Sequence, residues 1–188
     1  MLFALLFAPL IVAQAMTDLL HKEDDHDRQT IKVLQAMDAA MTAGNKEQLE
    51  AAVAKLKKLG GRSALDGVLK LTEPMKRALA IEGYRMLPVH AGWNDLQIFI
   101  VDRNPLVREQ VLLYAARWPQ GLGLTDVKMS LEDLAPEVRM MAVTAIIHVA
   151  KKPHDAAAVL RARLPDEKDP NVVRAIRVGL TALGERSQ

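Results

Sequence analysis

The stretch DRNPLVREQVLLYAAR, residues 102–117, decides the fold because the chain repeats it. Related stretches are EPMKRALAIEGYRML at 73–87, APEVRMMAVTAIIHV at 135–149 and PNVVRAIRVGLTALG at 170–184. Aligned on their shared arginine, the four stretches give Arg77, Arg108, Arg139 and Arg174, with spacings of 31, 31 and 35 residues. A regular period of this size is typical of a solenoid built from helical repeats.

Each repeat is expected to open a helix. Proline stands three residues before the arginine at positions 74, 105 and 136, whereas the last repeat has Asn171 there and its proline at 170. Proline suits the first helical turn, because its missing N–H would have no intrahelical partner there. An acidic residue just upstream can cap the helix or face its partial positive charge, and these residues are Glu73, Asp102, Asp133 and Asp169.

The helix expected after Pro136 is apolar almost all round. Val138 and Ala142 belong to one stripe at helical spacing, and Met140 and Val143 make the opposite side apolar as well. Such a helix is buried on most sides. Shorter helices are expected between the repeats, at 93–101, 124–134 and 154–164. No strand-like alternation bounded by turn signals occurs, so the fold is expected to be all-α.

Two further helices are expected before the repeats. The first runs from Thr17 or Asp18, either of which can cap it, to Gly44. The second runs from about residue 46 to 59 and ends at the pair Gly60–Gly61, since glycine readily takes the left-handed conformation after a helix.

The repeated order of acidic residue, proline, valine and arginine resembles the start of HEAT repeats, especially the short bacterial kind also found in phycobilin lyases. The resemblance covers about residues 63–185 and is clearest at 102–118, 133–150 and 169–184. The first unit departs with Lys76 in place of valine, the last with Asn171 in place of proline, and the period is shorter than is usual for HEAT. The resemblance implies a right-handed α-solenoid of HEAT-like helix pairs over residues 63–188, with residues 16–62 as capping helices.

The four arginines have two interpretations. The resemblance to HEAT arrays implies that Arg77, Arg108, Arg139 and Arg174 form a structural ladder, each paired with acidic groups or carbonyls of the adjacent repeat. Guanidinium suits such bidentate bonding. The functional alternative is a basic ladder that holds phosphates along a concave surface. The structural interpretation is favoured.

The first residues, MLFALLFAPLIVAQA at 1–15, predict a signal peptide or an N-terminal membrane anchor. Ala13, Gln14 and Ala15 have the A-x-A form of a signal-peptidase site. The apolar run is shorter than the roughly 20 residues of a transmembrane helix, and no Lys or Arg precedes it. A helix that docks on the domain or on a partner is the third alternative. The expected location is periplasmic or extracytoplasmic and membrane-associated, with the cytoplasm as the alternative.

The composition narrows the chemistry. The chain has 188 residues, enough for one domain or one short repeat array. It has no cysteine, which excludes disulfides, thiolate catalysis and cysteine-ligated zinc. A net charge of +2 does not favour nucleic acid or an acidic membrane as a partner.

Few residues suggest a binding or catalytic site. HKEDDHD at 21–27 has two histidines and several carboxylates, but its dense charge also fits a solvated helix. The other histidines, His90, His148 and His154, are isolated, and His148 is expected to be hydrogen-bonded and partly buried. No catalytic, cofactor-binding or metal-binding residues are therefore assigned. Four aromatic residues remain as possible partner contacts: Tyr84, Trp93, Tyr114 and Trp118.

These observations predict a non-enzymatic scaffold or accessory subunit that binds one or more proteins, with a membrane complex as one candidate partner. Residues 1–15 would provide any membrane contact. The alternative is a HEAT-like protein that binds nucleic acid through a basic concave face, which the leader and the small net charge disfavour. A bilin-lyase-like enzyme follows from the resemblance alone, because no residue of the chain indicates that activity.

Overall fold

The structure, a computed structural model, describes residues 23–87, 93–120 and 122–184. Within these ranges the chain forms helices and no β-strand, so the predicted all-α fold is confirmed. The predicted leader at 1–15 lies outside the described residues. The helices group into two compact units, residues 1–107 and 108–188, and each is described by itself. In the part of the chain that is described, no helix is both long enough and apolar enough to cross a membrane.

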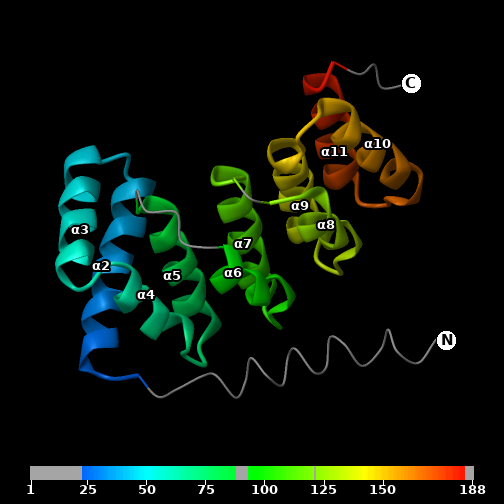
Figure 1. Ribbon diagram of the computed structural model, residues 1–188. Coiled ribbons are helices and arrows are strands. Elements are labelled where there is room, and N and C mark those ends of the chain that lie inside the picture. Colours follow the sequence, from blue (N-terminus) through cyan, green and yellow to red (C-terminus); the bar gives the residue numbers. More distant parts are fainter. Residues whose placement is uncertain (1–22, 88–92, 121, 185–188) are drawn as a thin grey trace, which may run out of the picture. The chain divides into compact units, whose positions relative to one another are not determined.

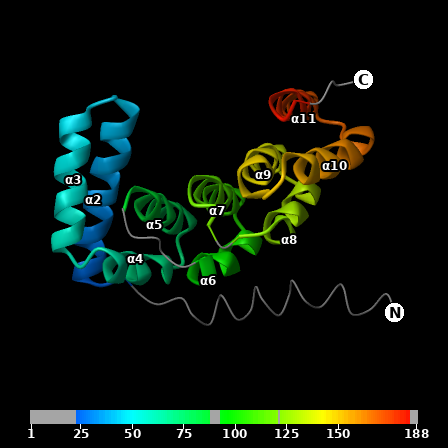
Figure 2. The same cartoon turned by 45° about the horizontal axis from the view of Figure 1, so that its top comes forward.

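The first unit contains α2 (Asp25–Thr42), α3 (Lys46–Lys58), α4 (Arg62–Leu69), α5 (Pro74–Met86), α6 (Trp93–Leu96) and the 3-10 helix η1 (Gln97–Val101). Helices α2 and α3 pack side by side, and α2 also contacts α4 and α5 (Figures 1 and 2). The core of this unit is aliphatic, with Leu34, Leu65 and Ile81 almost fully buried.

The second unit begins within the first turn of α7 (Pro105–Arg117). It continues with α8 (Leu124–Val127), η2 (Lys128–Glu132), α9 (Pro136–Val149), α10 (Pro153–Arg163), η3 (Leu164–Asp166) and α11 (Pro170–Ala182). Helix α9 contacts four other elements of this unit, namely α8, η2, α10 and α11 (Figure 1). That position explains its nearly continuous apolar sequence, and Val138, Ala142 and Ile146 are completely buried.

The four predicted helix starts are present, since α5, α7, α9 and α11 begin at Pro74, Pro105, Pro136 and Pro170. The acidic residue upstream was predicted either to cap each helix or to face its partial positive charge. In α11 it caps the helix, because the carboxylate of Asp169 accepts hydrogen bonds from the N–H groups of Asn171 and Val172. Glu73 makes no side-chain cap, and the residue directly before α9 is Ala135.

The predicted start of the first helix at Thr17 or Asp18 is wrong for α2, which begins at Asp25. Asp24 and Asp27 determine that start through a reciprocal capping box. The Asp24 carboxylate accepts from the N–H of Asp27 at 2.9 Å, and the Asp27 carboxylate accepts from the N–H of Asp24 at 3.2 Å. Four orphan N–H groups open every helix, and this box satisfies two backbone donors there.

The glycines predicted to end α3 behave as expected, with φ angles of 107° at Gly60 and 56° at Gly61. Two of the short helices predicted between the repeats are each split into an α-helical turn and a 3-10 turn. Residues 93–101 form α6 and η1, and residues 124–132 form α8 and η2. The longer α10 is followed by η3.

Candidate functional site

Arg77 is the most deeply buried of the ladder arginines. Its side chain is 5% exposed, and that of its partner Asp102 is 0% exposed. The guanidinium donates to both carboxylate oxygens, from Nε at 2.9 Å and from Nη2 at 3.0 Å. Its Nη1 donates to the backbone carbonyls of Leu71 and Thr72 at 2.8 and 2.7 Å. Arg77 therefore joins the turn before its own helix to the turn before the next one.

Arg108 repeats this contact in the second unit. Its Nε and Nη2 donate to the two carboxylate oxygens of Asp133 at 2.6 and 2.7 Å. Asp133 also accepts the N–H of Ala135 at 2.9 Å, as Asp102 accepts the N–H of Asn104 at 2.8 Å. In both pairs the carboxylate lies 25 residues after its arginine, so the contact follows the repeat.

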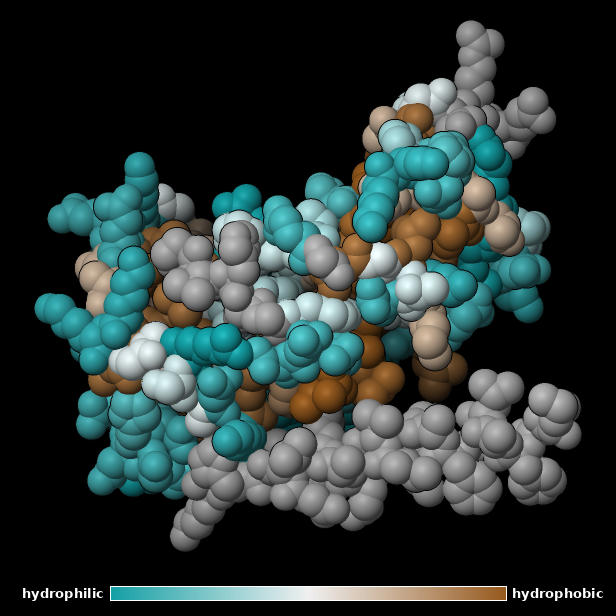
Figure 3. Space-filling model, viewed as in Figure 1, coloured by the Kyte–Doolittle hydropathy of each residue, from teal (hydrophilic) through white to brown (hydrophobic). Residues whose placement is uncertain are grey.

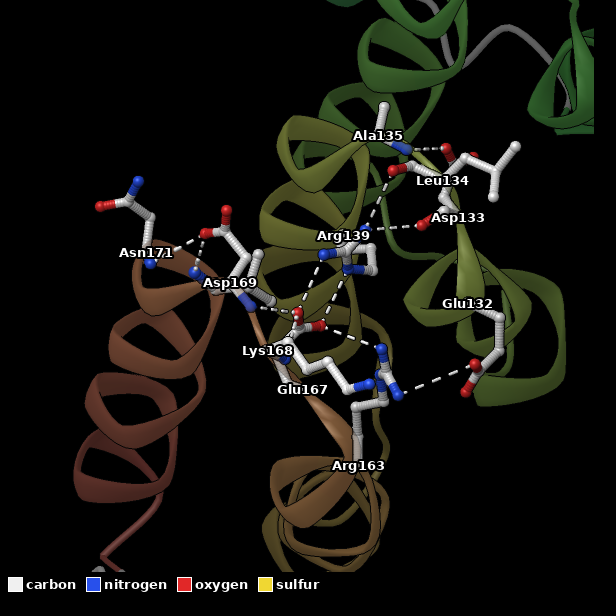
Figure 4. Close-up of polar contacts among 11 residues, drawn as sticks. Glu132, Asp133, Leu134, Ala135, Arg139, Arg163, Glu167, Lys168, Asp169 and Asn171 are labelled. Atoms are coloured by element: carbon white, nitrogen blue, oxygen red, sulfur yellow. Dashed lines mark hydrogen bonds and ion pairs between the residues drawn. The ribbon is translucent and has the colours of Figure 1, made fainter.

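Arg139 makes the third contact, with Glu167, 28 residues later (Figure 4). Its Nε and Nη2 donate to the Glu167 carboxylate at 2.8 and 2.9 Å, and Nη1 donates to the carbonyl oxygens of Asp133 and Leu134. Arg163 adds a second cation, because its Nη2 donates to Glu167 at 3.0 Å. The Glu167 side chain is 1% exposed, yet both of its oxygens have charged donors.

These contacts change the acidity of the carboxylates. The hydrogen bonds from Arg139, helped by the N–H of Asp169, lower the pKa of Glu167 to about 2 against the opposing effect of burial. At Asp133 burial acts to raise the pKa, but the hydrogen bonds from Arg108 and from the N–H of Ala135 outweigh it and hold the pKa below its ordinary value. Both carboxylates are therefore held in the charged form.

Arg174, the fourth predicted member of the ladder, does not repeat the contact. It is exposed, and its Nη2 donates to the side-chain oxygen of Asn171 in its own helix. Among the described residues it has no acidic partner, because no later described turn supplies one. The ladder therefore consists of Arg77, Arg108 and Arg139, and the prediction for Arg174 is corrected.

The sequence reasoning missed Glu167 and Arg163, and it assigned the acidic position of the last repeat to Asp169. A signal was present, because Asp102, Asp133 and Glu167 each stand three residues before a helix-opening proline. Asp169 stands one residue before its proline, in the cap position. The two positions have different roles. The acid three residues before the proline binds the arginine of the preceding repeat, and the acid directly before the proline caps the helix.

Four aromatic residues were predicted as possible partner contacts, and for two of them the structure corrects the prediction. Tyr84 is 0% exposed and Tyr114 is 2% exposed, so both belong to the core. Trp93 and Trp118 are half-buried. The guanidinium of Arg117 lies over the Trp118 ring, 5.1 Å from its centroid, which is a cation–π distance.

The Tyr84 hydroxyl belongs to a polar cluster on the first unit. It donates to the carboxylate of Asp66, and burial together with this hydrogen bond raises the pKa of Tyr84. Arg62 pairs with Asp95 and lies 4.0 Å from Asp66. The cluster thereby links α4, α5 and α6 and satisfies the one polar atom of a buried tyrosine.

Contacts of two of the described histidines, His148 on α9 and His154 on α10, can be compared with the predictions. His148 was predicted to be hydrogen-bonded and partly buried; its Nδ1 lies 2.9 Å from the carbonyl oxygen of Thr144, but the residue is exposed. His154 lies beside Asp155 on the surface. His21 and His90 lie outside the described residues. Within the described ranges, no three His, Asp or Glu residues are grouped so that they could hold a metal ion.

A groove lies between α2 and α3, and we call it the α2–α3 groove. It has a volume of about 330 Å³ and is lined by Lys32, Val33, Ala36, Gln48, Ala51, Ala52 and Lys55. Alanine side chains leave this space because they are too short to fill the gap between two neighbouring helices. Figure 3 shows hydrophilic side chains projecting at α2 and α3, with hydrophobic ones visible between them.

The described residues thus offer two kinds of feature. The ladder groups are engaged with one another, so they act as internal connections between turns. The α2–α3 groove is a partly apolar hollow between two helices, as formed by the described residues. Comparison of the chain with protein-family models, with curated proteins and with solved structures finds no match.

Proposed function

We propose that this chain is an α-solenoid of HEAT-like helix pairs that binds protein partners as a non-enzymatic scaffold or accessory subunit. The observation that carries the proposal is the recurring contact of Arg77, Arg108 and Arg139. Each arginine binds a carboxylate 25 or 28 residues ahead, in the turn before the next proline-initiated helix.

A recurring contact of this kind supports a repeat array because it needs only neighbouring units. In such arrays each repeat contacts its neighbours, and the stacked helices present extended surfaces on which a partner can bind. Protein recognition also fits the α2–α3 groove, which combines small apolar side chains with the exposed cations Lys32 and Lys55. A net charge of +2 gives little general attraction for nucleic acid.

We further propose that residues 1–15 export the protein or tether it to a membrane, which places the repeats outside the cytoplasm. Cleavage after Ala15 would give a mature chain that begins at Met16. A retained leader would instead anchor the repeats at a membrane complex.

Affinity capture of the native protein, combined with intact-mass measurement of its N-terminus, tests both parts. We expect one protein partner to be captured, and to stay bound when the salt concentration is raised. A mature start at Met16 supports export, and an intact Met1 with a membrane-complex partner supports anchoring. Recovery of nucleic acid alone, with binding that falls steeply as salt rises, would overturn the scaffold function.

A further inference from the structure

The α2–α3 groove has an apolar floor made of short side chains. Ala52 and Val33 are buried at its base, whereas Ala36 and Ala51 are exposed on its sides. Helix α3 contributes few buried side chains to the unit, namely Ala52 and Leu56. The space between the two helices is therefore bounded by the protein on one side and open on the other, and it can accept large apolar side chains from outside.

The charges at the groove are uncompensated within the described part of the chain. Lys32 on α2 and Lys55 on α3 are exposed and have no ion pair among the described residues. Two lysines of the same unit do have acidic partners: Lys46 lies 3.8 Å from Glu50, and Lys76 pairs with Glu73 at 2.7 Å. No carboxylate lines the groove, whose polar groups are the two ammonium groups and the Gln48 amide. The groove thus attracts anionic groups placed beside an apolar surface.

We propose that the α2–α3 groove binds an acidic amphipathic helix of a partner protein. This inference rests on the proposed scaffold function. The partner helix puts large apolar side chains between Ala36 and Ala51 and places carboxylates beside Lys32 and Lys55. Helices bind in grooves in this way, with apolar residues three and four apart as anchors. Charge complementarity selects an acidic helix over a basic one.

The test uses the full chain and three labelled helical peptides in a fluorescence-anisotropy titration. The acidic peptide has leucines on one face and glutamates beside them, the basic peptide replaces the glutamates with lysines, and the third peptide replaces the leucines with alanines. We expect the acidic leucine peptide to bind and the other two to bind at least about tenfold more weakly.

Two groove variants have matched controls on α3. Ala51→Trp fills the groove, and Ala54→Trp adds the same side chain at an exposed position outside its lining. Lys32→Glu/Lys55→Glu reverses the groove charge, and Lys57→Glu/Lys58→Glu makes the same charge change outside it. Each groove variant should lower the affinity for the acidic peptide by about tenfold or more, whereas each control should lower it by less than about twofold. The reversed groove should also bind the basic peptide more tightly.

Several results would overturn the proposal. One is an equal loss of affinity for the acidic peptide in the groove variants and in their controls, which would indicate nonspecific attraction. Others are the absence of acidic-peptide binding together with binding to phosphatidylglycerol vesicles, or self-association of the chain that both groove variants abolish. Circular dichroism verifies that every variant is folded.

The groove and the scaffold function can fail separately. If the native protein captures a protein partner that Ala51→Trp and Lys32→Glu/Lys55→Glu both retain, the groove proposal is wrong and the scaffold function stands. If the native protein captures no protein at all, the scaffold function fails, whatever the peptides show.

Discussion

Arg77 and Arg174 occupy the same place in the repeated sequence and have opposite surroundings. Arg77 is buried with the carboxylate of Asp102, whereas Arg174 is exposed and hydrogen-bonds to Asn171 three residues before it. The difference lies in the following turn, which supplies Asp102 to Arg77 and, within the described residues, supplies nothing to Arg174. An arginine in this motif therefore becomes a structural element when a later turn buries an acid beside it.

Removing the acid from the buried pair should have the largest effect. Asp102→Ala leaves the Arg77 charge buried without its counterion, which should lower the free energy of unfolding by about 3–5 kcal/mol. Urea denaturation followed by circular dichroism measures the loss. The double variant Arg77→Met/Asp102→Leu removes both charges and should be much less destabilised. Equal urea midpoints for Asp102→Ala and the unaltered protein would contradict this account.

Breaking the pair of Arg108 and Asp133 should have the second-largest effect on stability. Arg108→Ala leaves Asp133 with its hydrogen bond from Ala135 but without its guanidinium, and we expect a loss of about 2–3 kcal/mol. Thermal denaturation measures this effect, and partner binding at a distant surface should be unchanged. Unchanged stability with lost binding would instead make Arg108 a functional residue.

The third effect depends on pH. The pKa of Glu167 is lowered from 4.5 to about 2, so its contribution to stability is complete above about pH 4.5 and is lost as the pH falls toward 2. Glu167→Gln cannot titrate and should be less stable by about 2 kcal/mol at neutral pH. Urea unfolding of both proteins across this range should show the difference shrinking as the solution becomes acidic. A difference that stays constant would refute the role of the charge.

The smallest effect completes the comparison. Arg174→Ala removes one exposed hydrogen bond and should change the free energy of unfolding by less than about 0.5 kcal/mol. The same urea experiment measures it beside Arg139→Ala, which loses the buried contact with Glu167 and should be strongly destabilised. Similar losses in the two variants would show that the position in the repeat, rather than the acid in the next turn, makes the arginine structural.

The sequence predicted the features that depend on local chemistry. The proline starts of α5, α7, α9 and α11 follow from the fixed φ angle of proline and its missing N–H. The stripe predicted for the helix after Pro136 is buried as well, since Val138 and Ala142 are both completely buried. These features need only a short stretch of chain, so a repeated motif was enough to indicate them.

Other features depend on contacts between distant residues. The pairing of Arg139 with Glu167 spans a whole helix, and the choice between Glu167 and Asp169 depends on which carboxylate the turn brings to the guanidinium. Tyr84 was predicted only as a possible partner contact, and its burial could not be predicted because it depends on how α4 and α5 pack. The start of α2 was misplaced because it depends on the reciprocal hydrogen bonds between Asp24 and Asp27, which the sequence pattern did not indicate.

The ladder carboxylates have a kinetic consequence for the turns. Asp102 holds the amide of Asn104, Asp133 holds that of Ala135, and Glu167 holds those of Lys168 and Asp169. Amides in exposed turns usually exchange with solvent deuterium quickly, because no local opening has to precede exchange. Here the same side chains that accept the arginines also retain the turn hydrogens. The amide hydrogens of the turns before α7, α9 and α11 should therefore exchange as slowly as those of the helices that the turns join. In hydrogen exchange these turns should behave like the protein core.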